Sequence, residues 1–70
     1  MKFTDLDVVI TLSAFPDNGI RAGQIGTVVH AFTNPNEAYL IEFANDNGET
    51  LALVTAMPSQ IAIADLRKAA

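Results

Sequence analysis

The stretch Gly23-Gln24-Ile25-Gly26-Thr27-Val28-Val29 decides the fold predicted for this chain. Two glycines stand three positions apart and are followed at once by β-branched residues. Glycine adopts backbone angles that other residues resist, and β-branched residues fit the pleated surface of a strand. The pattern predicts a loop that leads into a strongly bent strand, with a β-bulge at the glycines producing the bend. A short sheet that curls onto itself needs such a bend.

Five segments share a high content of β-branched or alternating apolar residues, and we expect strands at residues 7–12, 25–32, 38–43, 50–56 and 61–64. The gaps between them are rich in glycine, proline, asparagine and aspartate, which favour turns. The first gap, at 13–22, is long, and loops of this length commonly carry function. The turn at 45–48 is predicted to have Asn47-Gly48 as its central pair. Pro58-Ser59-Gln60 predicts one turn of 3₁₀ helix before the last strand.

The third and fourth strands differ in their patterns of apolar residues. Alternation along the third strand predicts that Tyr39, Ile41 and Phe43 face the core. Along the fourth strand both faces are apolar, with Leu51 and Leu53 on one of them. Half of the chain is hydrophobic, which is a high content for so small a body. Either a tail, a dimer mate or a protein partner covers the second face, or the many alanines inflate the count.

The order of these segments predicts an all-β fold, a small five-stranded, mostly antiparallel SH3-like barrel with a short 3₁₀ turn before the last strand. The 70 residues make one domain. We expect the barrel at residues 1–64 and a flexible tail at 65–70. The chain has no cysteine, and no apolar stretch in it approaches the roughly 20 residues of a membrane span. It is therefore expected to be a soluble cytoplasmic protein without membrane association.

Six short motifs stand in order along the chain: Asp7-Val8-Val9, Gly23-Gln24-Ile25-Gly26-Thr27-Val28, Tyr39-Leu40-Ile41-Glu42-Phe43, Asn47-Gly48, Thr50-Leu51-Ala52-Leu53 and Pro58-Ser59-Gln60-Ile61. With these motifs the sequence resembles a small family of short bacterial proteins of unknown function, over nearly the whole chain except its last few residues. The resemblance implies an SH3-like barrel with no established activity. It also implies a neighbouring nuclease-like gene, as in toxin–antitoxin pairs, and it supplies no site residues.

The chain lacks the residue combinations that catalysis requires. His30 is its only histidine and it has no cysteine, so one chain supplies no nucleophilic cysteine and no multi-histidine metal site. Gly23 and Gly26 precede a β-branched strand, without the lysine and helix that follow a phosphate-binding loop. We therefore expect no enzyme activity, no catalytic residue, no metal and no cofactor.

The charge of the chain bears on its partners. Four lysines and arginines stand against eight acids, for a net charge of −4. Proteins that bind nucleic acid neutralise phosphates with cations, so a nucleic-acid partner is disfavoured. Acidity of this kind favours a basic protein partner, although it also serves solubility.

The candidate partner-binding residues are the apolar, aromatic and basic residues of the long loop and of the second turn, namely Phe15, Ile20, Arg21, His30, Phe32 and Tyr39. Aromatic and arginine side chains dominate the binding energy of many interfaces. For Phe15 and Ile20 there is an alternative, in which both fold back and plug the end of the barrel. Phe32 and Tyr39 carry the same ambiguity.

The sequence therefore predicts a non-enzymatic protein-binding module, with the neutralising (antitoxin- or immunity-like) partner of a co-encoded protein as its specific form. A homodimer is compatible with the same surplus of apolar residues. Two alternatives stay open: a nucleic-acid- or ribosome-associated barrel of the KOW-like type, and a small structural subunit of a larger complex.

Overall fold

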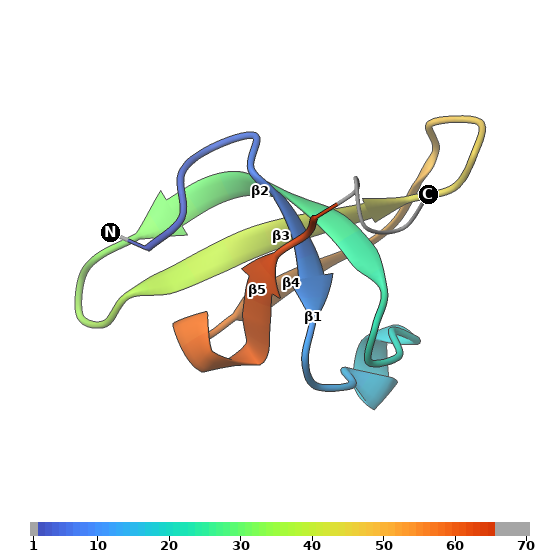
Figure 1. Ribbon diagram of the computed structural model, residues 1–70. Coiled ribbons are helices and arrows are strands. Elements are labelled where there is room, and N and C mark those ends of the chain that lie inside the picture. Colours follow the sequence, from blue (N-terminus) through green and yellow to red (C-terminus); the bar gives the residue numbers. More distant parts are fainter. Residues whose placement is uncertain (1, 66–70) are drawn as a thin grey trace.

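The computed structural model describes residues 2–65 and contains five strands and two short 3₁₀ helices (Figure 1). In chain order these are β1 (Val8–Thr11), η1 (Pro16–Asn18), β2 (Ile25–Phe32), β3 (Ala38–Ala44), β4 (Thr50–Ala56), η2 (Pro58–Gln60) and β5 (Ile61–Ile63). All five predicted strands are present, with ends shifted by one residue at β1, β3 and β5. The 3₁₀ turn before the last strand is confirmed. Except for Asp65, the predicted tail lies outside the described residues.

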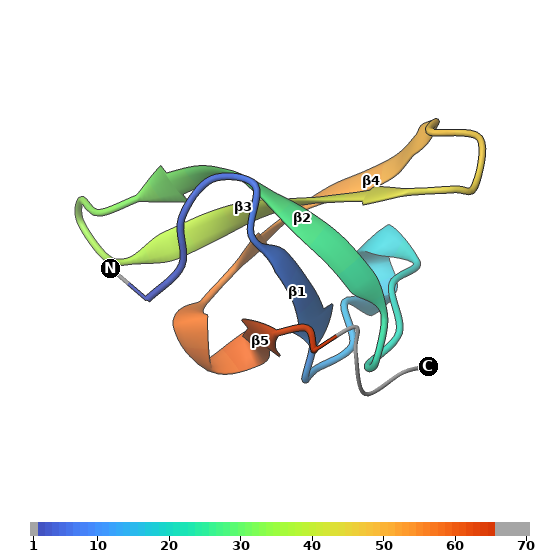
Figure 2. The ribbon, with the colours of Figure 1, turned by 45° about the horizontal axis from the view of Figure 1, so that its top comes forward.

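The strands form one sheet in the order β4-β3-β2-β1-β5, and every pair is antiparallel. The predicted all-β fold of five antiparallel strands is confirmed, but the sheet is not closed, because β4 and β5 do not pair with each other within residues 2–65. β5 is only three residues long and pairs with β1. β1 and β5 lie across the longer strands, while the β3–β4 hairpin projects from the body of the molecule (Figure 2).

The core lies on the concave side of this bent sheet. Tyr39, Ile41 and Phe43 of β3 are fully buried, as their alternation predicts. The other buried apolar residues come from every remaining strand and from two loops, and they are Phe3, Val9, Ile20, Val28, Val54, Ala56 and Ile61. The inner face of β4 is therefore covered by the chain itself, and its outer face is not.

Gly26 of β2 leaves room for the core side chains of the neighbouring strand β3. A Cβ at this position would lie 2.6 Å from Ile41 Cγ2 and 2.8 Å from Phe43 Cε1. The bulge predicted at the glycines was wrong in its position, because the register of β2 against β3 shifts between Val28 and His30. Gly26 itself does not form the bulge. It pairs in regular register with Val9 of β1, and its lack of a side chain leaves room for that pairing.

The turn between β3 and β4 also differs from its prediction. Gly48 N–H donates to the Asn45 carbonyl at 3.0 Å, so the central pair is Asp46-Asn47 and not Asn47-Gly48. Gly48 follows in the left-handed region, with φ +82°. The Asn45 side-chain oxygen accepts hydrogen bonds from the backbone N–H groups of Asn47 and Glu49 and so fixes the turn. This is the three-residue hairpin loop, in which glycine occupies the position after a type I turn.

The long loop is ordered by Thr11, which is a buried polar residue. Its hydroxyl donates to the Arg21 carbonyl at 2.8 Å and accepts from Gln24 N–H at 2.9 Å. Phe15 and Ile20 bridge across η1 through two backbone hydrogen bonds. Ile20 is buried and Phe15 packs against the core, which is the plugging arrangement that the sequence left open.

Candidate protein-binding surface

The side chains of β2, β3 and β4 that point away from the core form one continuous surface, which we call the outer face. Register places His30 beside Leu40 and Leu40 beside Thr55, while Glu42 lies beside Leu53. The apolar members of the outer face, together with those at its ends, are Phe32, Ala38, Leu40, Leu51, Leu53 and Met57. Leu51 is 60% exposed and Leu53 is 52% exposed.

The register shift between Val28 and His30 builds one side of the outer face. Gly26 and Val28 point inward, and uninterrupted alternation would turn His30 and Phe32 inward as well. The extra residue reverses the alternation, so that Ala31 packs against the core instead. His30 and Phe32 then meet on the outer face as an edge-to-face pair, with ring centroids 4.6 Å apart.

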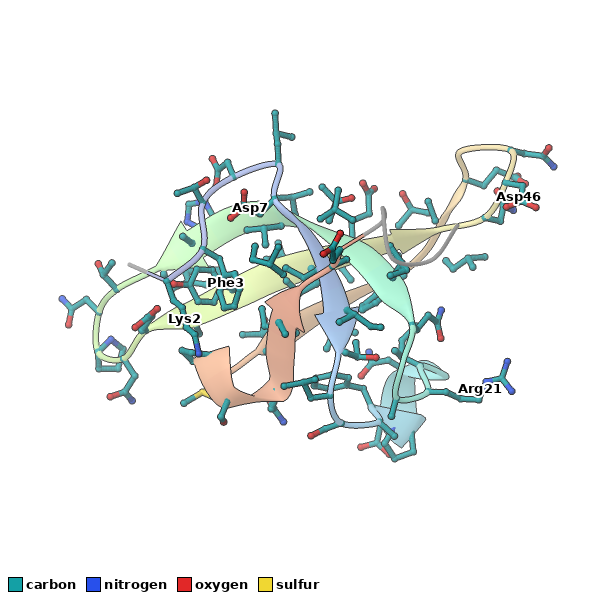
Figure 3. The ribbon with its side chains drawn as sticks, in the orientation of Figure 1. Lys2, Phe3, Asp7, Arg21 and Asp46 are labelled. Carbon is teal, nitrogen blue, oxygen red and sulfur yellow. The ribbon has the colours of Figure 1, made fainter. Side chains whose placement is uncertain are left out.

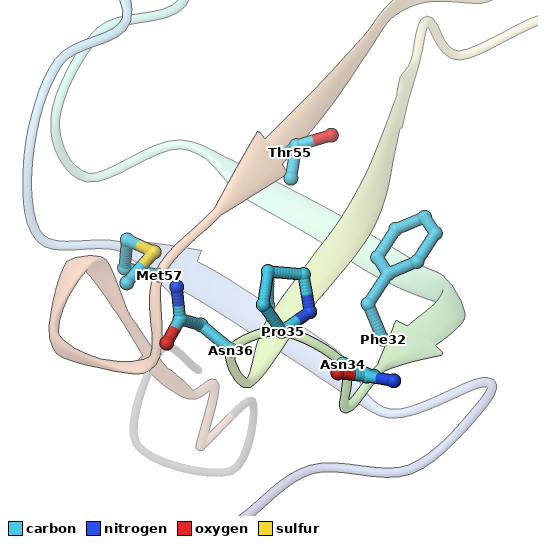
Figure 4. Close-up of a pocket in the computed structure, with 7 residues that line it drawn as sticks. Phe32, Asn34, Pro35, Asn36, Thr55 and Met57 are labelled. Carbon is cyan, nitrogen blue, oxygen red and sulfur yellow. The ribbon is translucent and has the colours of Figure 1, made fainter.

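One end of the outer face is hollowed into a shallow pocket of about 330 Å³ (Figure 4). Its lining joins the end of β2, the following turn, the start of β3 and the end of β4, with residues Phe32, Asn34, Pro35, Asn36, Ala38, Thr55 and Met57. Pro35 lies in the middle, between Phe32 on one side and Met57 on the other (Figure 4). The pocket is therefore largely apolar, with two amides and one hydroxyl available for hydrogen bonds.

The opposite end of the outer face is acidic. Glu42 lies within it, and its carboxylate accepts a hydrogen bond from the Thr50 hydroxyl at 2.5 Å. Asp46 and Glu49 follow on the turn of the projecting hairpin, where Figure 3 places Asp46 at the tip. No lysine or arginine occurs anywhere in residues 22–66. The surface is thus apolar at one end and negatively charged at the other.

The predicted site residues are divided between this surface and the rest of the molecule. His30 and Phe32 belong to the outer face. Ile20 and Tyr39 are core residues, and Phe15 is half-buried against the core. Arg21 is exposed on the long loop, where its side chain points away from the sheet (Figure 3).

Sequence reasoning left Leu40, Leu51, Leu53 and Met57 out of the candidate site. A signal for two of them was present, because β4 is apolar on both faces. No local sequence pattern indicates Met57, because the pocket that it lines is formed by two distant segments, the end of β4 and the turn after β2.

A polar cluster ties the N-terminal segment to β3. The Tyr39 hydroxyl donates a hydrogen bond to Glu37 Oε2 and accepts from the backbone N–H groups of Lys2 and Phe3, at 3.0 and 3.2 Å. Lys2 N–H also donates to Glu37 Oε2, at 3.1 Å. The Tyr39 hydroxyl, followed by the Lys2 backbone N–H, lowers the pKa of Glu37 below its ordinary value. The Tyr39 hydroxyl uses its donor and both of its acceptor positions within the chain, so its role in the cluster is structural.

This cluster predicts a pH dependence of stability. The folded-state pKa of Glu37 is lowered, so its ionised form stabilises the fold above the unfolded-state pKa of about 4.3. That contribution is lost as the pH falls through the lower, folded-state pKa. We expect wild type to exceed Glu37→Gln in free energy of unfolding at pH 7, and the difference to shrink below about pH 4. Urea unfolding at both pH values measures it, and an unchanged difference would contradict the role given to Glu37.

Within residues 2–65 the structure groups no three His, Cys, Asp or Glu side chains in an arrangement that could hold a metal ion. In the same part of the chain, no helix has the length and apolar character needed to cross a membrane.

No curated protein and no solved structure matches the chain. One family model does match, over residues 5–63, from the turn before β1 to the end of β5. The match spans all five strands and most of the chain, and the protein therefore belongs to the family described as "Domain of unknown function (DUF4926)".

Proposed function

We propose that this protein is a non-enzymatic protein-binding module and that the outer face is its binding surface. The observation that carries the proposal is the row of exposed apolar side chains on β4, Leu51 and Leu53, next to the half-buried Leu40 of β3. Contiguous exposed apolar patches on small soluble proteins commonly mark sites of protein association. In its specific form, the proposal makes the protein a cytoplasmic, neutralising partner of a co-encoded protein.

The charges of the same region favour a protein over a nucleic acid. A nucleic-acid surface needs cations to neutralise phosphates, and residues 22–66 contain no lysine or arginine. Glu42 would face such a ligand directly from the outer face. A protein partner with basic residues would instead be attracted to this end of the surface.

The test is co-expression with the product of the adjacent gene, followed by co-purification. We expect Leu53→Lys to reduce the bound partner at least about tenfold, because it removes an apolar side chain from the centre of the contact and places a cation beside Glu42, where it repels a basic partner. Leu53 is 52% exposed, so its replacement should change stability by no more than about 0.5 kcal/mol. Thermal unfolding of the variant checks this.

Arg21→Ala is the matched control, because Arg21 is exposed but lies on the long loop, away from the outer face. It should leave the bound fraction unchanged. If Arg21→Ala lost binding while Leu53→Lys kept it, the interface would lie on the long loop and not on the outer face. A chain that purifies without any specific protein would overturn the proposed function itself.

A further inference from the structure

The exposed edge of β4 is unlike the protected edges of most natural sheets. An edge strand has backbone N–H and C=O groups without strand partners, and proteins usually protect such edges with lysine, proline or a very short strand. β4 is seven residues long and contains no charged residue and no proline. It pairs with β3 on one side and ends the sheet on the other. The edge is therefore suited to accept another strand.

η1 is the 3₁₀ helix that approaches β4. The residues on either side of η1, Phe15 and Ile20, pack in or against the core. η1 therefore approaches β4 from the concave side and leaves the outer face and its apolar side chains uncovered.

The two ends of β4 differ in a way that indicates the chemistry of the added strand. Thr55 and Met57 lead to the apolar pocket around Pro35. Thr50, at the other end, lies beside Glu42 and close to the acidic hairpin turn. A strand along β4 would thus pass from an apolar pocket to a cluster of carboxylates that lacks cations of its own.

We infer that the partner supplies an extended basic segment, which pairs with the free edge of β4, places an apolar side chain in the pocket and directs lysine or arginine toward Glu42, Asp46 and Glu49. The inference rests on the proposed function and specifies its partner. Backbone hydrogen bonds give affinity in strand addition, and alternate side chains give specificity.

The geometry sets the spacing of the residues in the segment. Side chains on one face of a strand recur at every second residue, at ~3.3 Å per residue. Thr55 and Leu51 are about four residues apart along β4, which corresponds to ~13 Å. The apolar residue and the first cation of the segment are therefore expected about four positions apart, with a further apolar residue between them.

A second copy of the chain is a weaker candidate for this edge. It would bring a strand of the same composition and no lysine or arginine from residues 22–66. Residues 22–66 of a second copy would therefore supply no lysine or arginine to Glu42, Asp46 and Glu49. A basic segment neutralises them, and charge complementarity therefore favours it.

The experiment is selection of binders from a displayed library of random peptides of about twelve residues, on wild type, on Leu53→Lys and on Arg21→Ala. We expect wild type and Arg21→Ala to select peptides with alternating apolar residues and lysine or arginine about four positions away, and Leu53→Lys to lose them. In a synthesised peptide, replacing each cation by glutamine should weaken binding by about two- to fivefold. Backbone NMR shifts on binding should concentrate at residues 50–57.

Several other results would overturn the inference. Selected peptides that lack cations, or that shift the signals of residues 13–22, would place recognition elsewhere while leaving a protein-binding function intact. A second result would be that the adjacent gene's product binds, that Leu53→Lys abolishes this binding, and that no peptide is selected. The outer face would then remain the binding surface, and strand addition would be excluded. A wild-type dimer that Leu53→Lys dissociates in sedimentation would assign the edge to a second copy. Failure of both the peptides and the whole partner to bind would remove the proposed function as well.

Discussion

Replacing Gly26 by valine is expected to leave about half of the molecules folded, or fewer, at 25 °C. A Cβ at this position would lie 2.6 Å from Ile41 Cγ2 and 2.8 Å from Phe43 Cε1, and both of those side chains are buried. Excess volume in a packed core costs about 1–3 kcal/mol, occasionally more. A domain of this size has roughly 3–5 kcal/mol of stability in total. Valine adds two methyl groups to the Cβ, so the cost should reach that total.

Gly26→Ala and Gly23→Ala form the matched pair that isolates the steric effect. Alanine at Gly26 should lower the free energy of unfolding by about 2 kcal/mol. Gly23 has φ +85° and open space around it, so alanine there costs only the backbone conformation, about 1 kcal/mol. Urea unfolding followed by circular dichroism measures both. Equal losses would contradict the close packing of Ile41 and Phe43 against Gly26.

Replacing Phe3 by alanine should destabilise the fold by about 3–5 kcal/mol, which approaches the whole stability of the domain. Phe3 is 2% exposed, and its ring meets that of Tyr39 edge to face, with centroids 5.1 Å apart. Its backbone N–H donates to the Tyr39 hydroxyl. Removing the ring leaves a cavity and loosens the N-terminal segment from β3.

Phe32→Ala is the control for this substitution, because Phe32 is 38% exposed and lies on the outer face. Its stability in thermal unfolding should fall much less than that of Phe3→Ala, while its binding to the partner should weaken through loss of the pocket wall. A Phe3→Ala protein as stable as wild type would contradict the place of the N-terminal segment in the core.

Local patterns were sufficient to predict the strands of this fold. The alternation of Tyr39, Ile41 and Phe43 identifies the core face of β3, and it is confirmed by their burial. The ends of the strands are set by glycine, proline and asparagine, whose effects are local too. Pro58-Ser59-Gln60 forms its 3₁₀ turn for this reason, as proline fixes the first position of the turn.

Features that depend on contacts between distant segments could not be predicted in this way. Phe3 precedes the first strand and has no periodic pattern around it, yet it meets Tyr39 in the core. The position of the bulge in β2 depends on the register of β2 with β3. No pattern in the sequence around Gly26 and Val28 indicates that the extra residue follows Val28. Whether the sheet closes depends on the distance between β4 and β5, which no local pattern specifies.

The candidate site follows the same division. His30 and Phe32 were candidate partner-binding residues, with contact or burial left open for Phe32, and only the bulge brings them to the same face as Leu40. The surplus of apolar residues in β4 indicated a covered or contacting face, and the structure shows that this face is exposed in the single chain. The pocket requires Met57 and Pro35 together, which are far apart in the sequence.

The most direct measurement is amide hydrogen exchange of the chain, alone and in complex with the co-purified partner. If the partner binds the outer face by pairing with the edge of β4, the amides of Thr50–Ala56 will exchange more slowly in the complex, while those of residues 13–22 keep their rates. Protection confined to the long loop, with β4 unchanged, would contradict a binding surface on β2, β3 and β4.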